Sequence, residues 1–384
     1  MTLWLSATVV IAQEATGVST AGELKARIDQ LVDQLRSPEF AARQAATTAL
    51  LALDATGSGI LDQKSRSLEE PEASAVRQIV VRLRKRLYDD RLSELMKSQG
   101  PDVAAKLPEW QRFSEIVGTD DKALDVFIEM LQIEKDLFAL RLFSSPELAG
   151  LMESRSREFS KLCNGRRDVP FPVATCAALM LLGSDSALDL PRLTSTQISD
   201  AFSDPRFGEL VDEGVYAPCL RRLAGAWMNR TNRNGRPAIA VDRPLLFAIE
   251  HDVEEGRTLA LNSIRTGAKY QSMAYSLLCL AKFRRAEDLK VVEPLLESES
   301  VLWPLANQKN KLLPTGDPTS TYRVQIRDVA LVVAASLRQR DPSDFGSLAQ
   351  PSDTTVYDFY SLGFEKDADR IAAINSYRTS FPSR

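Results

Sequence analysis

One recurring helical stripe limits how this chain can fold more than any other feature of its sequence. In the stretch FAARQAATTALLAL, residues 40–53, apolar side chains recur at steps of three and four residues. These positions are Ala42, Ala45, Ala46, Ala49 and Leu53. The spacing predicts an α-helix with one apolar face, which needs a partner surface to bury it. A helix expected over 22–36 supplies the first such partner.

Further copies of this stripe lie downstream. The second copy begins 34 residues later and places apolar side chains at Val76, Ile79, Val80, Leu83 and Leu87. The third copy has them at Ile326, Val329, Ala330, Val333 and Leu337. A weaker fourth copy has Tyr270, Met273, Ala274, Leu277 and Ala281, and an amphipathic segment over 286–298 would complete its helix pair. We interpret the shared stripe as an internal repeat.

An arginine follows the first apolar position in three of the copies, as Arg43, Arg77 and Arg327. We expect these arginines to be structural. The stem of each side chain would pack while its head reaches a carboxylate or carbonyl of the adjacent repeat. The alternative is a basic stripe that binds an acidic partner.

The repeated pattern of an apolar residue, an arginine and then small apolar residues leading to a leucine resembles the second helix of HEAT-like repeats. The resemblance covers about 150 residues at the two ends of the chain, in the manner of a degenerate repeat array. The chain also resembles exported bacterial proteins with HEAT-like repeats, whose last repeat can precede an aromatic segment like 344–364. The resemblance implies an all-α solenoid, a superhelix of stacked antiparallel helix pairs that is degenerate in its centre.

The sequence divides into regions on this basis. We expect N-terminal HEAT-like repeats over 20–100, a divergent helical region over 101–265, and C-terminal repeats with a capping segment over 266–384. The cap, 365–381, would set Ile371, Ile374 and Tyr377 against the last repeat. No alternating pattern of convincing length predicts a strand.

Residues 1–12 are typical of a signal peptide. An apolar run from Leu3 to Ala12 places Val10 and Ala12 at the −3 and −1 positions of a cleavage site before Gln13. We therefore expect an exported protein, periplasmic or extracellular. No positive residue precedes the run, so a cytoplasmic protein with an apolar tail is the alternative. No segment is long and apolar enough to span a membrane as a helix.

Several kinds of chemistry find no support in the sequence. The formal net charge of −4 disfavours a nucleic-acid partner, because binding phosphate needs a positive field. Four cysteines form no C-x-x-C pair. The single histidine, His251, could share a metal with Glu255 if both lay on one helix, but we favour a solvated acidic face over 250–255. We expect no cofactor and no metal.

Two polar loops are the candidates for partner contact. The first, 229–244, carries Arg230, Arg233 and Arg236, and the second, 303–323, carries Trp303, Lys309 and Lys311. Insertions on a solenoid often gather on its binding face. These features predict a non-catalytic scaffold that binds a protein or peptide. The alternatives are an enzyme or enzyme-associated factor, as in lyases with HEAT-like repeats, or a structural component of the cell envelope.

Overall fold

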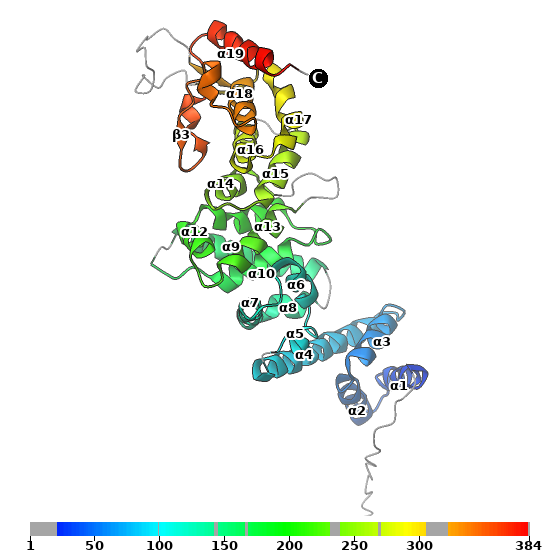
Figure 1. The fold of residues 1–384 in the computed structure, drawn as a ribbon. Helices are drawn as coiled ribbons and strands as arrows, with labels where there is room; N and C mark the ends of the chain where they lie inside the picture. The colour runs from blue at the N-terminus through cyan, green and yellow to red at the C-terminus, as the bar shows by residue number, and fades with distance from the viewer. Residues whose placement is uncertain are drawn as a thin grey trace, which may run out of the picture. The chain divides into compact units, whose positions relative to one another are not determined.

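The computed structural model describes residues 21–98, 100–141, 145–165, 168–230, 239–267, 270–304 and 322–382. This part of the chain is mostly helical, with nineteen α-helices and four short strands, so the predicted all-α class is confirmed. The chain separates into two compact units, the first ending at Ser93 and the second beginning at Glu94 (Figure 1). Among the described helices, none combines the length and apolarity needed to cross a membrane.

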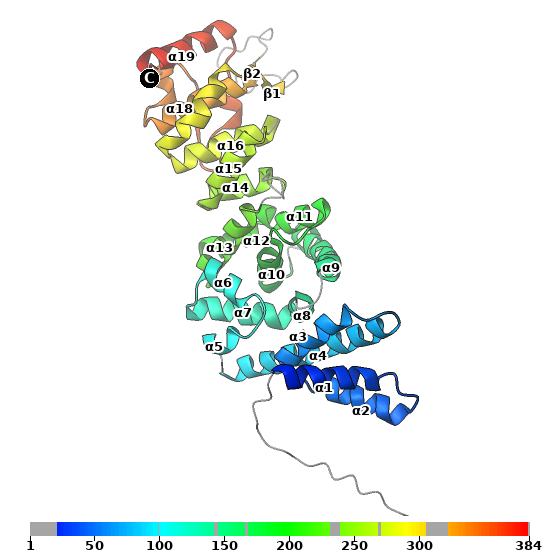
Figure 2. The same cartoon turned by 90° about the vertical axis from the view of Figure 1, so that its right-hand side faces the viewer.

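The first unit contains four helices around a small apolar core. They are α1 (Ala21–Gln34), α2 (Phe40–Leu51), α3 (Ala55–Ser65) and the larger part of α4 (Glu72–Ser98). Helices α1 and α2 lie side by side, as Figure 2 shows, and α1 also contacts α3. The core is formed by Ile28, Val32, Leu50, Leu61, Val76, Ile79, Val80 and Leu83. Four of the five positions predicted for the second copy of the stripe are therefore buried.

The stripe of α2 faces the core differently from the prediction. The buried residues are Ala46 and Leu50, whereas Ala45 is exposed and the helix ends at Leu51. Burying a leucine removes more apolar surface from water than burying an alanine, so the helix turns Leu50 inward. Spacing alone could not rank these faces, because both carry apolar residues.

The first half of the second unit contains the buried helix α10 and the helices that precede and follow it. In order they are α5 (Pro101–Ala104), α6 (Trp110–Val117), α7 (Asp121–Ile133), α8 (Lys135–Arg141), α9 (Ser145–Gly165), α10 (Val173–Gly183), α11 (Arg192–Ile198), the 3-10 helix η1 (Ser199–Ser203), α12 (Pro205–Asp212) and α13 (Ala217–Met228). Helix α10 is buried along most of its length and contacts α7, α9, α11 and α13. A Cβ atom on Gly183 would lie 2.6 Å from the ring of Trp227, so this glycine permits the close packing of α10 and α13.

In the rest of the second unit, helix α16 is the element that contacts most of its neighbours. Its elements are α14 (Asp242–Glu250), α15 (Glu255–Arg265), α16 (Tyr270–Phe283), η2 (Ala286–Asp288), α17 (Leu289–Val292), η3 (Glu293–Glu297), β1 (Val301–Pro304), β2 (Arg323–Gln325), α18 (Ile326–Leu337), η4 (Pro342–Phe345), β3 (Pro351–Ser352), β4 (Val356–Tyr357), η5 (Phe359–Ser361) and α19 (Asp367–Ser380). Helix α16 contacts α14, α15 and α18, and the strands form two antiparallel pairs, β1–β2 and β3–β4.

The predicted C-terminal stripes are buried, and in α18 further residues are buried besides the predicted ones. All five predicted positions of α18 are buried, but so is every other residue of that helix except Arg327. In α16, the described side chains of the stripe are buried as well. The amphipathic segment predicted over 286–298 is present as η2, α17 and η3 instead of one helix. Pro294 lies at this break, since its ring has no N–H for a regular helical bond.

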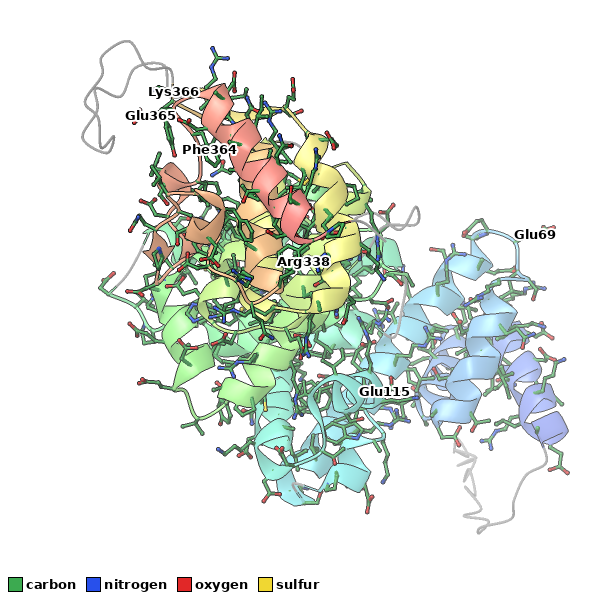
Figure 3. All side chains as sticks on the ribbon, turned by 45° about the horizontal axis from the view of Figure 1, so that its top comes forward. Glu69, Glu115, Arg338, Phe364, Glu365 and Lys366 are labelled. Carbon is green, nitrogen blue, oxygen red and sulfur yellow. The ribbon has the colours of Figure 1, made fainter. Side chains whose placement is uncertain are left out.

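Helix α19 caps the end of the chain. Its buried residues are Arg370, Ala373, Ile374 and Tyr377, while Ile371, which we expected to be buried, is 50% exposed. Figure 3 shows Phe364, Glu365 and Lys366 at the start of this helix and Arg338 at the end of α18. Arg338 Nε donates to the Tyr377 hydroxyl, which in turn donates to Glu293, with donor–acceptor distances of 2.8 Å in both bonds.

Candidate functional site

A cleft of about 630 Å³ lies where η1, α12 and α14 meet. Five carboxylates line it: Asp204, Glu209, Asp212, Glu213 and Glu250. Arg243 and His251 line it too, and Phe202 and Phe247 supply an apolar wall. The cleft therefore combines negative charge with aromatic surface, and it is the candidate functional site.

The local sequence of α12 explains the acidic side. Asp204 and Pro205 form a helix start, in which the Asp204 carboxylate accepts a hydrogen bond from the backbone N–H of Arg206 at 3.0 Å. Three acidic residues follow, and Glu209, Asp212 and Glu213 fall at positions i, i+3 and i+4 of the chain. Glu209 and Asp212 are therefore neighbours on the surface of α12, and Glu213 is the residue that follows the end of this helix.

The aromatic wall fixes the position of His251. The Phe247 ring stacks on Phe207 at a centroid distance of 5.3 Å and lies 4.9 Å from Phe202. The His251 ring packs 4.3 Å from that of Phe247. A Cβ atom on Gly208 would lie 2.6 Å from this imidazole, so glycine is needed for α12 to approach so closely.

His251 joins the ends of two helices. Its Nδ1 lies 2.9 Å from Asp212 Oδ2, and its Nε2 lies 3.8 Å from Glu250 Oε2. The pairing considered with Glu255 on a single helix does not occur, because α14 ends at Glu250 and α15 begins at Glu255. Nowhere in the described residues do three or more His, Cys, Asp or Glu side chains gather as metal ligands.

The carboxylates of the cleft differ in whether they already have an ion-pair partner within the protein. Asp204 is buried and pairs with Arg206, whereas Asp212 pairs with His251 and lies 3.7 Å from Arg221. Glu209 and Glu213 are exposed, and neither forms an ion pair within the described ranges. These two glutamates leave negative charge facing solvent.

Arg243 does not neutralise this charge. Its guanidinium pairs with Asp200, a buried residue outside the lining. Asp200 also accepts hydrogen bonds from the Ser160 hydroxyl and, at 3.1 Å, from the Asn164 amide. Arg243 is the one arginine among the described lining residues, and it is already paired with a carboxylate that does not line the cleft.

The predicted contact loops are described only in part. Arg233, Arg236, Lys309 and Lys311 lie outside the described residues, as does the side chain of Trp303, whose backbone belongs to β1. Arg230 is described, and it is 6% exposed instead of projecting from a loop. Its guanidinium packs over the ring of Trp227, with the Cζ atom 5.7 Å from the ring centroid. A residue so buried does not present its charge to a protein partner.

Two of the three repeated arginines, Arg43 and Arg77, have a role that differs from the expected one. Arg43 donates to the carbonyls of Ser37 and Pro38 at 2.8 and 2.9 Å, just before its own helix. Arg77 pairs with Glu70, also ahead of its helix. Side chains near a helix start point back towards the N-terminus, so both arginines fasten the segment that leads into the helix.

Arg327 differs slightly from the other two arginines. Its Nε donates to the Gln325 side chain at 2.6 Å, and its Nη1 pairs with Glu299, which follows η3, at 3.0 Å. Of the three repeated arginines, Arg327 therefore comes nearest to the expected contact with a preceding helical segment.

None of the four cysteines is among the described residues that line the cleft. Burial raises the pKa of Cys163 to about 12 and raises the pKa values of Cys176, Cys219 and Cys279 as well. Such thiols are poor nucleophiles, because the thiolate is the reactive form.

Comparisons with protein-family models, with curated proteins and with solved structures find no match for this chain.

Proposed function

We propose that the chain is a non-catalytic scaffold of HEAT-like helix pairs whose acidic cleft binds a basic peptide segment of a partner protein. The observation that carries this proposal is the pair Glu209 and Glu213, exposed and without ion-pair partners in the described residues, beside an aromatic wall. Charge complementarity of this kind accelerates association and selects among partners.

The chemistry of the cleft suits arginine or lysine side chains. A guanidinium bonds two carboxylate oxygens at once and also stacks on aromatic faces. The chain itself provides an example at the cleft wall, where Arg243 pairs with Asp200. The partner would place its basic side chains against Glu209 and Glu213 and its apolar atoms near Leu246 and Phe202.

The packing of the second unit supports the scaffold part of the proposal. Helices α14, α15, α16 and α18 contact one another in succession, and apolar residues fill the contacts. In a solenoid, each helix pair buries its stripe against the next pair, and stability is the sum of such neighbouring interfaces. The repeated stripes at α16 and α18 agree with that arrangement.

The state of the potentially reactive groups supports a non-catalytic role. The thiols have raised pKa values, and His251 is held between Phe247 and Asp212.

We also propose that the mature protein begins at Gln13 and acts outside the cytoplasm. This proposal rests on the signal-like pattern of residues 1–12.

Fluorescence anisotropy with labelled peptides tests the proposal. A peptide with several arginines should bind the full chain, a peptide of equal length with glutamates should not, and rising salt should weaken binding. The double variant Glu209→Gln/Glu213→Gln should weaken binding about tenfold, since each lost charge pair contributes up to about 1 kcal/mol.

The matched control removes two exposed glutamates outside the cleft. The double variant Glu69→Gln/Glu115→Gln has the same net charge as the cleft variant, and both residues are labelled in Figure 3. It should bind the arginine peptide like the wild type. Equal weakening in both variants would show that general charge, and not the cleft, holds the peptide.

A further inference from the structure

One face of α4 consists of exposed residues with no negative charge among them. Its members are neighbours at helical spacing, and we call them the α4 face: Gln78, Val81, Arg82 and Lys85. Asp89, one turn beyond Lys85, is half-buried and ends the row. Val81 is 42% exposed, so a large apolar side chain lies open to water between the charges. The α4 face therefore offers two cations and one apolar side chain to a partner.

The two cations of the α4 face are available for binding. In the described part of the chain neither Arg82 nor Lys85 forms an ion pair, whereas their neighbours Arg84 and Arg86 pair with aspartates of the same unit at 3.1 and 3.3 Å. Exposed charges are ordinary on a protein surface. A partner is indicated only by a surface that matches both the charge and its spacing.

The acidic cleft matches the α4 face in charge and spacing. Glu209 and Glu213 are exposed and form no ion pair within the described ranges. The Glu213 backbone N–H donates to the Glu209 carbonyl at 2.9 Å, so the two residues are one helical turn apart. Arg82 and Lys85, three positions apart on α4, are also separated by about one turn. Each cation can therefore meet one glutamate.

The two surfaces also match in their apolar side chains. Val81 is adjacent to Arg82 in the sequence and one turn before Lys85. Leu246 and Phe202 line the cleft together with its glutamates. Contact between Val81 and these side chains would remove apolar surface from water. This second match adds selectivity to the attraction between the charges.

We propose that the partner of the acidic cleft is a second copy of this chain, whose α4 face places Arg82 and Lys85 on Glu209 and Glu213. The inference rests on the proposed function and names the partner of that site. The two surfaces differ, and they belong to different compact units of the chain. The contact is therefore heterologous, with the α4 face of one copy against the cleft of another. Exposed ion pairs are weak and screened by salt, so the association is reversible and salt-dependent.

Sedimentation velocity of the full chain tests this contact. At low salt the mean mass of the wild type should rise with concentration, and high salt should return it to that of a single chain. Arg82→Gln/Lys85→Gln should weaken the self-association about tenfold. The matched control Lys25→Gln/Arg27→Gln removes two exposed cations of α1 and should associate like the wild type.

A charge exchange between the two surfaces gives the sharpest comparison. Glu209→Lys/Glu213→Lys makes both surfaces positive, and Arg82→Glu/Lys85→Glu makes both negative, so each variant alone should remain a single chain. Mixing the two variants should restore association, because each surface of one variant then meets a surface of opposite charge on the other.

A wild type that stays a single chain at every concentration, or a mixture no larger than its two components, overturns the proposal. The arginine peptide separates this failure from failure of the proposed function. If a monomeric wild type binds the peptide at its cleft, the cleft recognises basic segments and only the self-association is wrong. If it neither binds the peptide nor associates, both proposals are wrong.

Discussion

Arg370 and Asp328 form an ion pair closed to solvent, in which Arg370 Nε lies 2.6 Å from Asp328 Oδ1 and the side chains are 2% and 0% exposed. Arg370 also donates to the carbonyl of Arg323 at 3.0 Å. Asp328 accepts the Gln325 backbone N–H at 2.8 Å, as part of the cap at the start of α18. The pair therefore fastens the capping helix α19 to β2 and α18.

Replacing Arg370 by methionine should destabilise the chain strongly. The change leaves Asp328 buried without its ion-pair partner, and breaking a buried pair in this way costs about 3–5 kcal/mol. The matched control is Arg378→Met on the same helix, which breaks an exposed pair with Glu297 and should cost no more than about 1 kcal/mol. Urea unfolding measures both, and similar losses in the two variants would show that burial of the pair has no special role.

The stability of the chain should depend on the protonation of Glu134. This residue follows α7, is 2% exposed, and accepts a hydrogen bond from the Thr175 hydroxyl at 2.5 Å. Burial raises its pKa, although Thr175 and Arg155 oppose the shift. The folded state then keeps its proton to higher pH than the unfolded state, so this residue's contribution to stability falls as pH rises from the unfolded pKa through the folded one.

Glu134→Gln removes this dependence and keeps an acceptor for Thr175. The unfolding free energy of the variant, relative to the wild type, should increase from about pH 4 upward and then stay constant. Urea unfolding across this range measures it. Glu153→Gln, a change at a half-buried glutamate of α9 that pairs with Arg157, serves as the control, and its stability curve should run parallel to that of the wild type. If the unfolding free energy of Glu134→Gln changed with pH in parallel with that of the wild type, the proposed role of the Glu134 carboxyl would be wrong.

The four thiols should react slowly in the folded chain. With the pKa of Cys163 at about 12 and the other three pKa values also raised, little thiolate exists near neutral pH. A disulfide reagent that releases a coloured thiol should modify the native protein far more slowly than the urea-unfolded protein. Rapid reaction of one thiol under native conditions would contradict this prediction and would identify that cysteine as a candidate nucleophile.

The mature chain should begin at Gln13 when it is produced from its own gene. Intact-mass measurement on fractionated cells tests this expectation. Loss of residues 1–12 together with recovery outside the cytoplasm would agree with export. An uncleaved chain in the cytoplasm would remove the proposed location and restrict the search for partners to that compartment.

Much of the helical structure could be predicted from the sequence, because local rules determine it. The apolar run of α10 and its end at Gly183 are readable from residue types alone. The stripes at α4 and α18 follow from spacing. The face of α2 was harder to predict, since choosing Leu50 over Ala45 depends on what packs against the helix.

The functional features were less predictable, because they depend on contacts between distant residues. Glu213 and Glu250 line the same cleft although they are 37 positions apart in the chain. The sequence around α12, with its helix start at Asp204 and the acidic residues that follow, indicates only the acidic side of the cleft. The burial of Arg230 and Arg370 runs against the usual exposure of charged side chains and becomes visible only in the folded chain.

The most direct test of the proposed function is charge reversal in the cleft. The variant Glu209→Lys/Glu213→Lys should fold like the wild type, lose at least about tenfold in affinity for the arginine peptide, and gain binding of the glutamate peptide. Both affinities are measured by anisotropy with the same two peptides. Unchanged binding of the arginine peptide by the reversed chain would contradict the account, because the cleft would then not be the site that recognises basic segments.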